Sequence, residues 1–171
     1  MHQNSTFDVN IDKKKLLLLI LYLAEKYVDG ITRLHKMVFL IQKKLGLNFF
    51  RFDAFLFGPW SEDLQDTLND LIYQGLVEIK KISVNHTDTG YKRVIFLTEK
   101  GAKIAAEVYD KIMKRNPMLA LKLSKLVENY NKLPITYLIS LIYALYPEVA
   151  SLSLIKEKVE AWWRYYGLES E

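Results

Sequence analysis

The chain contains no cysteine, and its three histidines lie far apart in the sequence. Without cysteine there are no disulfides and no thiolate metal ligands, so a reducing compartment is the expected setting. His2, His35 and His86 form no recognisable ligand set for a metal ion. We therefore expect no metal, no cofactor and a cytoplasmic location.

Glycine and proline are also scarce, at seven and four of 171 residues, whereas half of the residues are apolar. This composition disfavours disorder and supplies enough apolar side chains for a sizeable core. The length fits one domain, or one small domain with an appendage.

Long apolar runs are absent too, and the run LLLLILYLA at 16–24 has only nine residues. Because it follows Lys13, Lys14 and Lys15, it has one feature of a signal peptide. However, Glu25 follows at once, no small-residue cleavage pattern is present, and a bilayer-spanning helix needs about 20 apolar residues. We interpret the run as a buried first helix, capped by Asp12 and ending at Asp29-Gly30, and we expect no membrane association.

A helix followed by a β-hairpin is predicted between Gly58 and Gly101. After the Gly58-Pro59 turn, Ser61 is suited to cap a helix, and Gly75 is suited to end it. Apolar residues recur within it at helical spacing, namely Leu64, Leu68, Leu71 and Ile72. Two β-branched and aromatic segments, 77–84 and 91–97, then flank a polar loop at 85–90, as in a hairpin. A bulge at Lys80-Lys81 would keep the apolar residues of the first strand on one face.

Further helices are predicted on both sides of this segment. Thr32 is expected to cap a helix that reaches Leu45, and residues 48–57 read as a short strand or an extended loop. Helices are expected at 98–115, 118–132 and 134–146, with a last one capped by Ser151 or Ser153 that ends near Tyr166. The predicted fold is mainly α with a β-hairpin wing, a winged helix-turn-helix extended by C-terminal helices. We expect residues 1–11 to form a flexible tail, 12–115 the winged-helix domain, and 116–171 a helical extension for dimerisation or interaction.

Four segments give the chain a resemblance to a group of prokaryotic winged-helix regulator-like proteins. They are RLHKMVFLIQ, FDAFLFGPWSEDLQDTLNDLIYQGLVE, LTEKG and LISLIYALYPE. This group includes phage-associated and archaeal proteins and, more distantly, the Panacea domain of SocA-like antitoxins. The resemblance spans roughly residues 14–166 and implies a winged-helix fold with a role in regulation or in toxin–antitoxin interaction. It implies no catalytic residues.

The helix at 61–74 occupies the position of a recognition helix, but its charge argues against reading the major groove. Residues 58–76 contain four carboxylates and no lysine or arginine. Gln65 and Asn69 are residue types that recognise adenine. The four acids, however, would repel a phosphate backbone.

The predicted hairpin is better suited to DNA, because Lys80, Lys81, Lys92 and Arg93 gather on it, with His86 near its tip. A basic wing can follow a phosphate backbone or enter the minor groove. Arg33 and Lys36 are expected to extend this basic rim, together with the lysines at 13–15. The alternative is a solvated hairpin, since lysines commonly keep edge strands soluble.

The C-terminal aromatic residues suggest a protein interface as well. Trp162, Trp163, Tyr165 and Tyr166 lie in the segment AWWRYYGL, and Trp60 and the phenylalanines around Phe55 add to the aromatic content. Trp, Tyr and Arg are typical anchors of interfaces. The alternative is that both C-terminal tryptophans are buried within the monomer.

From these observations we expect a DNA-binding transcriptional regulator that binds double-stranded DNA mainly through a basic wing and forms a homodimer. The alternative is an antitoxin-like or adaptor module that binds a protein partner and no DNA. An enzyme is not expected, because no nucleophile–base arrangement or glycine-rich phosphate loop is present. Paired acids such as Glu62 and Asp63 are explained by the positive end of a helix.

Overall fold

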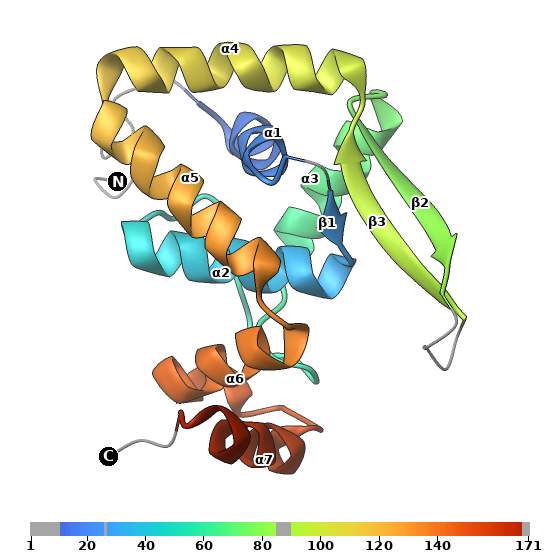
Figure 1. Ribbon diagram of the computed structural model, residues 1–171, viewed down its shortest axis with the longest axis vertical. Helices are drawn as coiled ribbons and strands as arrows, with labels where there is room; N and C mark the ends of the chain where they lie inside the picture. The colour runs from blue at the N-terminus through green and yellow to red at the C-terminus, as the bar shows by residue number, and fades with distance from the viewer. Residues whose placement is uncertain (1–10, 26, 85–89, 169–171) are drawn as a thin grey trace.

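The computed structural model describes residues 11–25, 27–84 and 90–168. Over these ranges it contains seven α-helices, a short 3₁₀ helix and a three-stranded antiparallel sheet (Figure 1). The predicted mainly helical fold with a β-hairpin is therefore confirmed. Apart from Ile11, the predicted flexible tail lies outside the described residues.

The elements follow one another in the order that Figure 1 labels. They are α1 (Lys13–Leu23), β1 (Val28–Asp29), α2 (Ile31–Leu45), α3 (Glu62–Tyr73), β2 (Val77–Ser83), β3 (Tyr91–Leu97), α4 (Glu99–Arg115), α5 (Pro117–Lys132), α6 (Ile135–Leu145), the 3₁₀ helix η1 (Pro147–Ala150) and α7 (Lys156–Tyr166). None of the helices in the described ranges has both the length and the apolar content needed to cross a bilayer.

Helix α1 is the centre of the core. Its residues 16–21 are all buried, and it contacts α3, α4 and α5 (Figure 1). A helix that is apolar on every side must be covered on every side, so the interpretation of this run as a buried helix is confirmed. Asp12 caps it by accepting a hydrogen bond from the Lys15 N–H. The predicted end at Asp29-Gly30 is wrong, because Val28 and Asp29 instead pair with β3.

The sheet has the order β1-β3-β2, and its hairpin contains no bulge. Lys80 lies opposite Val94 and Lys81 opposite Arg93 in an unbroken register, so the bulge prediction is wrong. The physical reason is that the outer half of the hairpin leaves the core. Ile82 is 40% exposed and does not have to share a face with the buried residues.

Two of the other predicted caps are confirmed and two are wrong. Ser61 and Thr98 cap α3 and α4 through their hydroxyl oxygens. Thr32 does not cap α2, whose N-cap is Gly30, a residue with φ of 103°. Neither Ser151 nor Ser153 caps α7, whose N-cap is Ile155.

The C-terminal helices share the core with the first part of the chain. Helix α5 packs against α1, α2 and α4, and α6 packs against α2, while α7 covers α6 (Figure 1). A single cluster of buried apolar residues runs through these helices. Residues 48–57 form an extended loop without a regular strand, in which Asp53 pairs with Trp60 as an isolated bridge.

Candidate nucleic-acid interface

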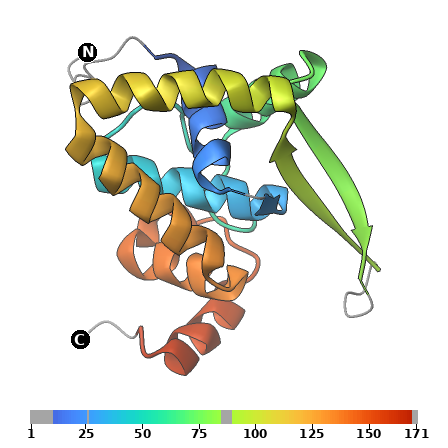
Figure 2. The ribbon, with the colours of Figure 1, turned by 45° about the horizontal axis from the view of Figure 1, so that its top comes forward.

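The hairpin of β2 and β3 extends away from the helices as an arm (Figures 1 and 2). Strand β1 supports only its base, by pairing with Val94 and Ile95. The base is also tied to α4, because the Thr98 N–H donates to the carbonyl of Leu76. Beyond this base the arm consists of two strands and presents both faces to its surroundings.

The register of the hairpin separates the four predicted cations into two pairs, because successive side chains point to opposite faces. Lys81 and Arg93 are direct cross-strand partners on the face that, at the base, carries Val77 and Ile95. Lys80 and Lys92 lie on the other face. The structure therefore brings the four residues onto one arm but does not gather them into one patch.

Lys80 and Lys92 have contacts within the protein. The Lys92 ammonium is 3.2 Å from a carboxylate oxygen of Asp29 on β1, and it lies 5.5 Å from the centre of the Tyr27 ring. The Lys80 ammonium lies 4.9 Å from the centre of the Phe96 ring. These contacts attach the arm to β1 and cover an aromatic side chain, so this face has a structural role.

Within the ranges that the structure describes, Lys81 and Arg93 have no such contacts. Both are exposed, and neither takes part in any ion pair of the described residues. Like charges directly opposite each other on a sheet are destabilising. A bound anion would remove that repulsion, so this pair is the best-placed anion site on the arm. His86, predicted near the tip, lies outside the described residues.

Arg33 is half-buried and its side chain is hydrogen-bonded within the protein. Its Nη1 donates to three carbonyl oxygens at the C-terminal end of α5, those of Tyr130 at 3.2 Å, Asn131 at 3.3 Å and Leu133 at 2.6 Å. Carbonyls at the end of a helix lack an N–H partner four residues ahead, although the Leu133 N–H also donates to that of Tyr130, and a cation there suits the helix dipole. The side chain therefore fastens α2 to α5 and does not extend a basic rim.

The prediction that Lys36 contacts DNA is wrong, because this side chain is 2% exposed. Its ammonium donates to the carbonyl oxygen of Pro59 at 2.9 Å, and burial lowers its pKa to about 8. Lys36 therefore holds the Gly58-Pro59 corner against α2.

The added Cβ of any residue at Gly58, where φ is 97°, would lie 3.0 Å from the ring of Tyr143 and 3.4 Å from Lys36 Cε.

His35 holds the other side of this corner. Its ring is stacked on Trp60 with centroids 3.7 Å apart, and its Nδ1 accepts a hydrogen bond from the Ser61 N–H at 3.2 Å. Because Nδ1 is an acceptor, the proton of the neutral ring is on Nε2, which lies 3.3 Å from the Gln65 Oε1. Burial, aided by the charge of Lys36 and opposed by the Gln65 hydrogen bond, lowers the pKa of His35 to about 4.

The two predicted adenine-reading residues on α3 are bound to each other. Gln65 Nε2 donates to Asn69 Oδ1 at 3.2 Å, while its oxygen faces His35. The exposed acids around them are Glu62, Asp66 and Asp70. Asp63 is paired with Lys13 of α1 at 2.7 Å. The outer face of α3 is therefore acidic, and its amides are already engaged.

Three of the four predicted interface aromatics attach α7 to the rest of the chain. Trp163 Nε1 donates to the Ser140 carbonyl at 2.8 Å, Tyr166 shares a 2.7 Å hydrogen bond with Thr136, and Trp162 packs against the core. Tyr165, at 83% exposed, is the most exposed of the four, and the other three are partly exposed.

An exposed apolar patch, which we call the leucine–phenylalanine patch, extends the predicted aromatic surface around Phe55 with leucines that sequence reasoning missed. It consists of Phe55, Leu56, Phe57, Leu152 and Leu154, all between 39% and 71% exposed. Its two segments are joined by a hydrogen bond from the Leu154 N–H to the Leu56 carbonyl at 2.8 Å. The signal available in the sequence was the run FLF at 55–57. The segment that contains Leu152 and Leu154 lies almost a hundred residues later, so the pairing of the two could not be predicted.

Comparisons of the chain with protein-family models, curated proteins and solved structures gave no match.

Proposed function

We propose that this chain is a winged-helix DNA-binding transcriptional regulator that contacts the phosphate backbone through Lys81 and Arg93. The observation that carries the proposal is the direct opposition of these two exposed cations, without an ion-pair partner among the described residues, on an arm that leaves the body. The order of three helices followed by a hairpin, with a short strand β1 beside it, supports the winged-helix assignment.

In this proposal the acidic helix α3 does not enter the major groove, and affinity comes from phosphate contacts. Such contacts position a protein on the duplex but carry no sequence information directly. We therefore expect binding that depends strongly on salt and weakly on base sequence.

The test is a salt series of duplex binding, measured by fluorescence anisotropy. When the logarithm of the affinity is plotted against the logarithm of the salt concentration, each phosphate contact contributes roughly 0.9 to the steepness of the slope. Lys81→Ala/Arg93→Ala should therefore reduce that steepness by about 1.8. Lys111→Ala/Lys122→Ala removes the same charge from exposed positions on α4 and α5 and is the matched control. An equal loss of slope in both double variants would mean that net charge, not the hairpin, attracts the DNA.

A second candidate is an antitoxin-like or adaptor module that works through protein contacts without binding DNA. The leucine–phenylalanine patch favours it, because large apolar patches on soluble proteins often mark interaction sites. The simplest version of this second candidate is a homodimer formed through the leucine–phenylalanine patch.

Sedimentation velocity, combined with the DNA-binding series, separates this candidate from the first. A dimer of the intact chain should dissociate in Phe57→Asp/Leu154→Asp, whose side chains are already exposed, so folding should be retained. A monomeric intact chain that binds DNA would contradict the second candidate, and an absence of DNA binding in a dimeric chain would contradict the first.

A further inference from the structure

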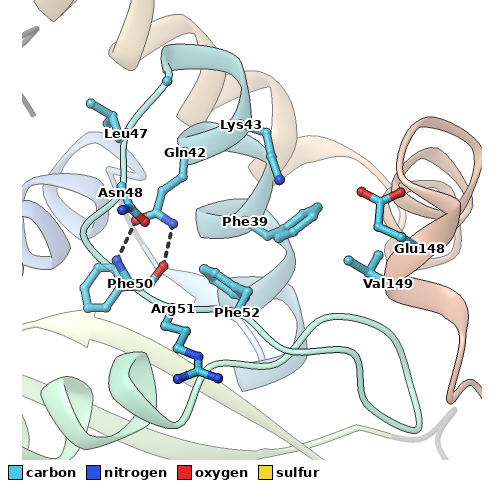
Figure 3. Close-up of a pocket in the computed structure, with 11 residues that line it drawn as sticks. Phe39, Gln42, Lys43, Leu47, Asn48, Phe50, Arg51, Phe52, Glu148 and Val149 are labelled. Carbon is cyan, nitrogen blue, oxygen red and sulfur yellow. Dashed lines mark hydrogen bonds between the residues drawn. The ribbon is translucent and has the colours of Figure 1, made fainter. Parts of the chain in front are cut away.

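An open pocket of about 680 Å³ lies between α2, the loop after it and η1 (Figure 3). Its volume falls within the range typical of small-molecule sites. Its apolar lining includes Phe39, Phe52 and Val149. The rings of Phe39 and Phe52 meet edge to face, with centroids 5.4 Å apart, which makes this side of the pocket rigid.

Most polar groups of the pocket are already engaged. The side chain of Gln42 binds the backbone of Phe50 at both its N–H and its carbonyl, as the dashed lines in Figure 3 show. Arg51 is paired with Asp53 at 3.5 Å. These groups shape the loop and are not the groups that would recognise a ligand.

The charged side chains at the pocket that are not engaged in this way are Lys43 and Glu148, which have opposite charges. Figure 3 shows Lys43 from α2 and Glu148 from η1 on either side of the Phe39 ring. Neither side chain occurs in an ion pair within the described part of the chain. The Lys43 ammonium is held 5.6 Å from the centre of the Phe39 ring and 5.4 Å from that of Tyr146, two residues before Glu148.

We propose that this pocket binds a free α-amino acid with an apolar side chain. Lys43 would bind the carboxylate, Glu148 the ammonium group, and the apolar side chain would lie on Phe39, Phe52 and Val149. A free amino acid is the common metabolite class that presents both charges on one carbon atom next to an apolar group. The inference is independent of the proposed DNA binding, because it is tested without DNA.

The probes are L-phenylalanine and L-leucine, titrated into the full chain and followed by isothermal titration calorimetry and by NMR shifts. Affinities in the micromolar to millimolar range are expected for ligands of this size. Phenethylamine, which lacks the carboxylate, and 3-phenylpropanoate, which lacks the ammonium group, should each bind at least about tenfold more weakly.

Lys43→Met and Glu148→Gln should weaken amino-acid binding by a similar factor. Both residues are exposed, so the variants should fold, and thermal unfolding checks this. Lys44→Met and Glu157→Gln, which change exposed residues that do not line the pocket, are the matched controls. The proposal is overturned if neither amino acid gives saturable binding, if the single-charge analogues bind equally well, or if the control variants lose as much affinity.

Discussion

Lys36 and Lys81 are the same residue type, but the corner and the hairpin give them opposite roles. Lys36 lies 2% exposed against the Pro59 carbonyl, with its pKa lowered to about 8 by burial. Lys81 is exposed on the arm, opposite Arg93. A lysine removed from water loses hydration and must find acceptors inside the protein, whereas an exposed lysine is available to an external anion. A count of basic residues therefore says little about DNA contact until burial is known.

The polar residues at the corner, as a group, differ from the cations on the arm in the same way, because they are buried. His35, Lys36 and Ser61 are all buried, and each has a hydrogen bond within the protein. Their interactions hold the chain between α2 and α3, which places the hairpin that follows. The corner thus contributes to stability, whereas Lys81 and Arg93 on the arm are exposed.

The largest effect is expected at the base of the arm, where Gly101 packs against the backbone of Leu76. A Cβ at this position would overlap the Leu76 carbonyl, so Gly101→Ala should lower the free energy of unfolding by about 3 kcal/mol. The control is Gly46→Ala, where φ is 65° but no atom lies within 4 Å, with an expected loss of about 1 kcal/mol. Urea unfolding measures both, and equal losses would show that the close approach at Gly101 is unimportant.

At the corner, stability should fall in acid because of His35. Its pKa is about 4 in the folded chain and near 6.5 unfolded, so between these values the unfolded chain binds the extra proton. The free energy of unfolding should therefore drop by about 3 kcal/mol between pH 7 and pH 4. His35→Gln should lack this part of the pH dependence. If the free energy of unfolding changed with pH in the same way in both proteins, the dependence would not be due to His35.

Lys36 should make the protein more stable in alkali, so its contribution, like that of His35, increases with pH. Its pKa is about 8 in the folded chain and 10.5 unfolded, so the folded chain loses its proton first and becomes relatively more stable. Between pH 7 and pH 9.5 the free energy of unfolding should rise by about 2 kcal/mol relative to that of Lys36→Met. A difference that does not change with pH would mean that Lys36 is in contact with water.

The smallest effects on stability are expected on the arm. Lys81→Ala/Arg93→Ala should change the free energy of unfolding by less than about 0.5 kcal/mol, with a slight gain from the lost repulsion. Lys92→Ala should instead lose about 0.5 kcal/mol, because it breaks the contact with Asp29. If the double variant were clearly the less stable protein, the exposed pair would have a structural role like that of the corner.

Much of the local structure could be predicted from residues near one another in the sequence. The caps at Asp12, Ser61 and Thr98 each act on an N–H three residues ahead, and the hairpin follows from two β-prone segments around a polar loop. The error at Ser153 has a cause in the tertiary structure. The Ser153 hydroxyl accepts a hydrogen bond from Tyr143 at 2.7 Å.

The candidate site was predicted only in part. That Lys80, Lys81, Lys92 and Arg93 share a hairpin could be predicted, but their division into two faces depended on the absence of a bulge. Arg33 failed as a predicted site residue because its acceptors lie about a hundred residues later, at the end of α5. The pocket beside Lys43 was not predicted, since Glu148 reaches it from a separate helix.

The sequence by itself determined the helices, most of their ends and the hairpin, because capping, helical spacing and turn chemistry act over a few residues. Only the tertiary structure decided which cations face water. Burial depends on which distant segments cover a side chain, and Lys36 and Lys81 differ in that covering, not in their own chemistry.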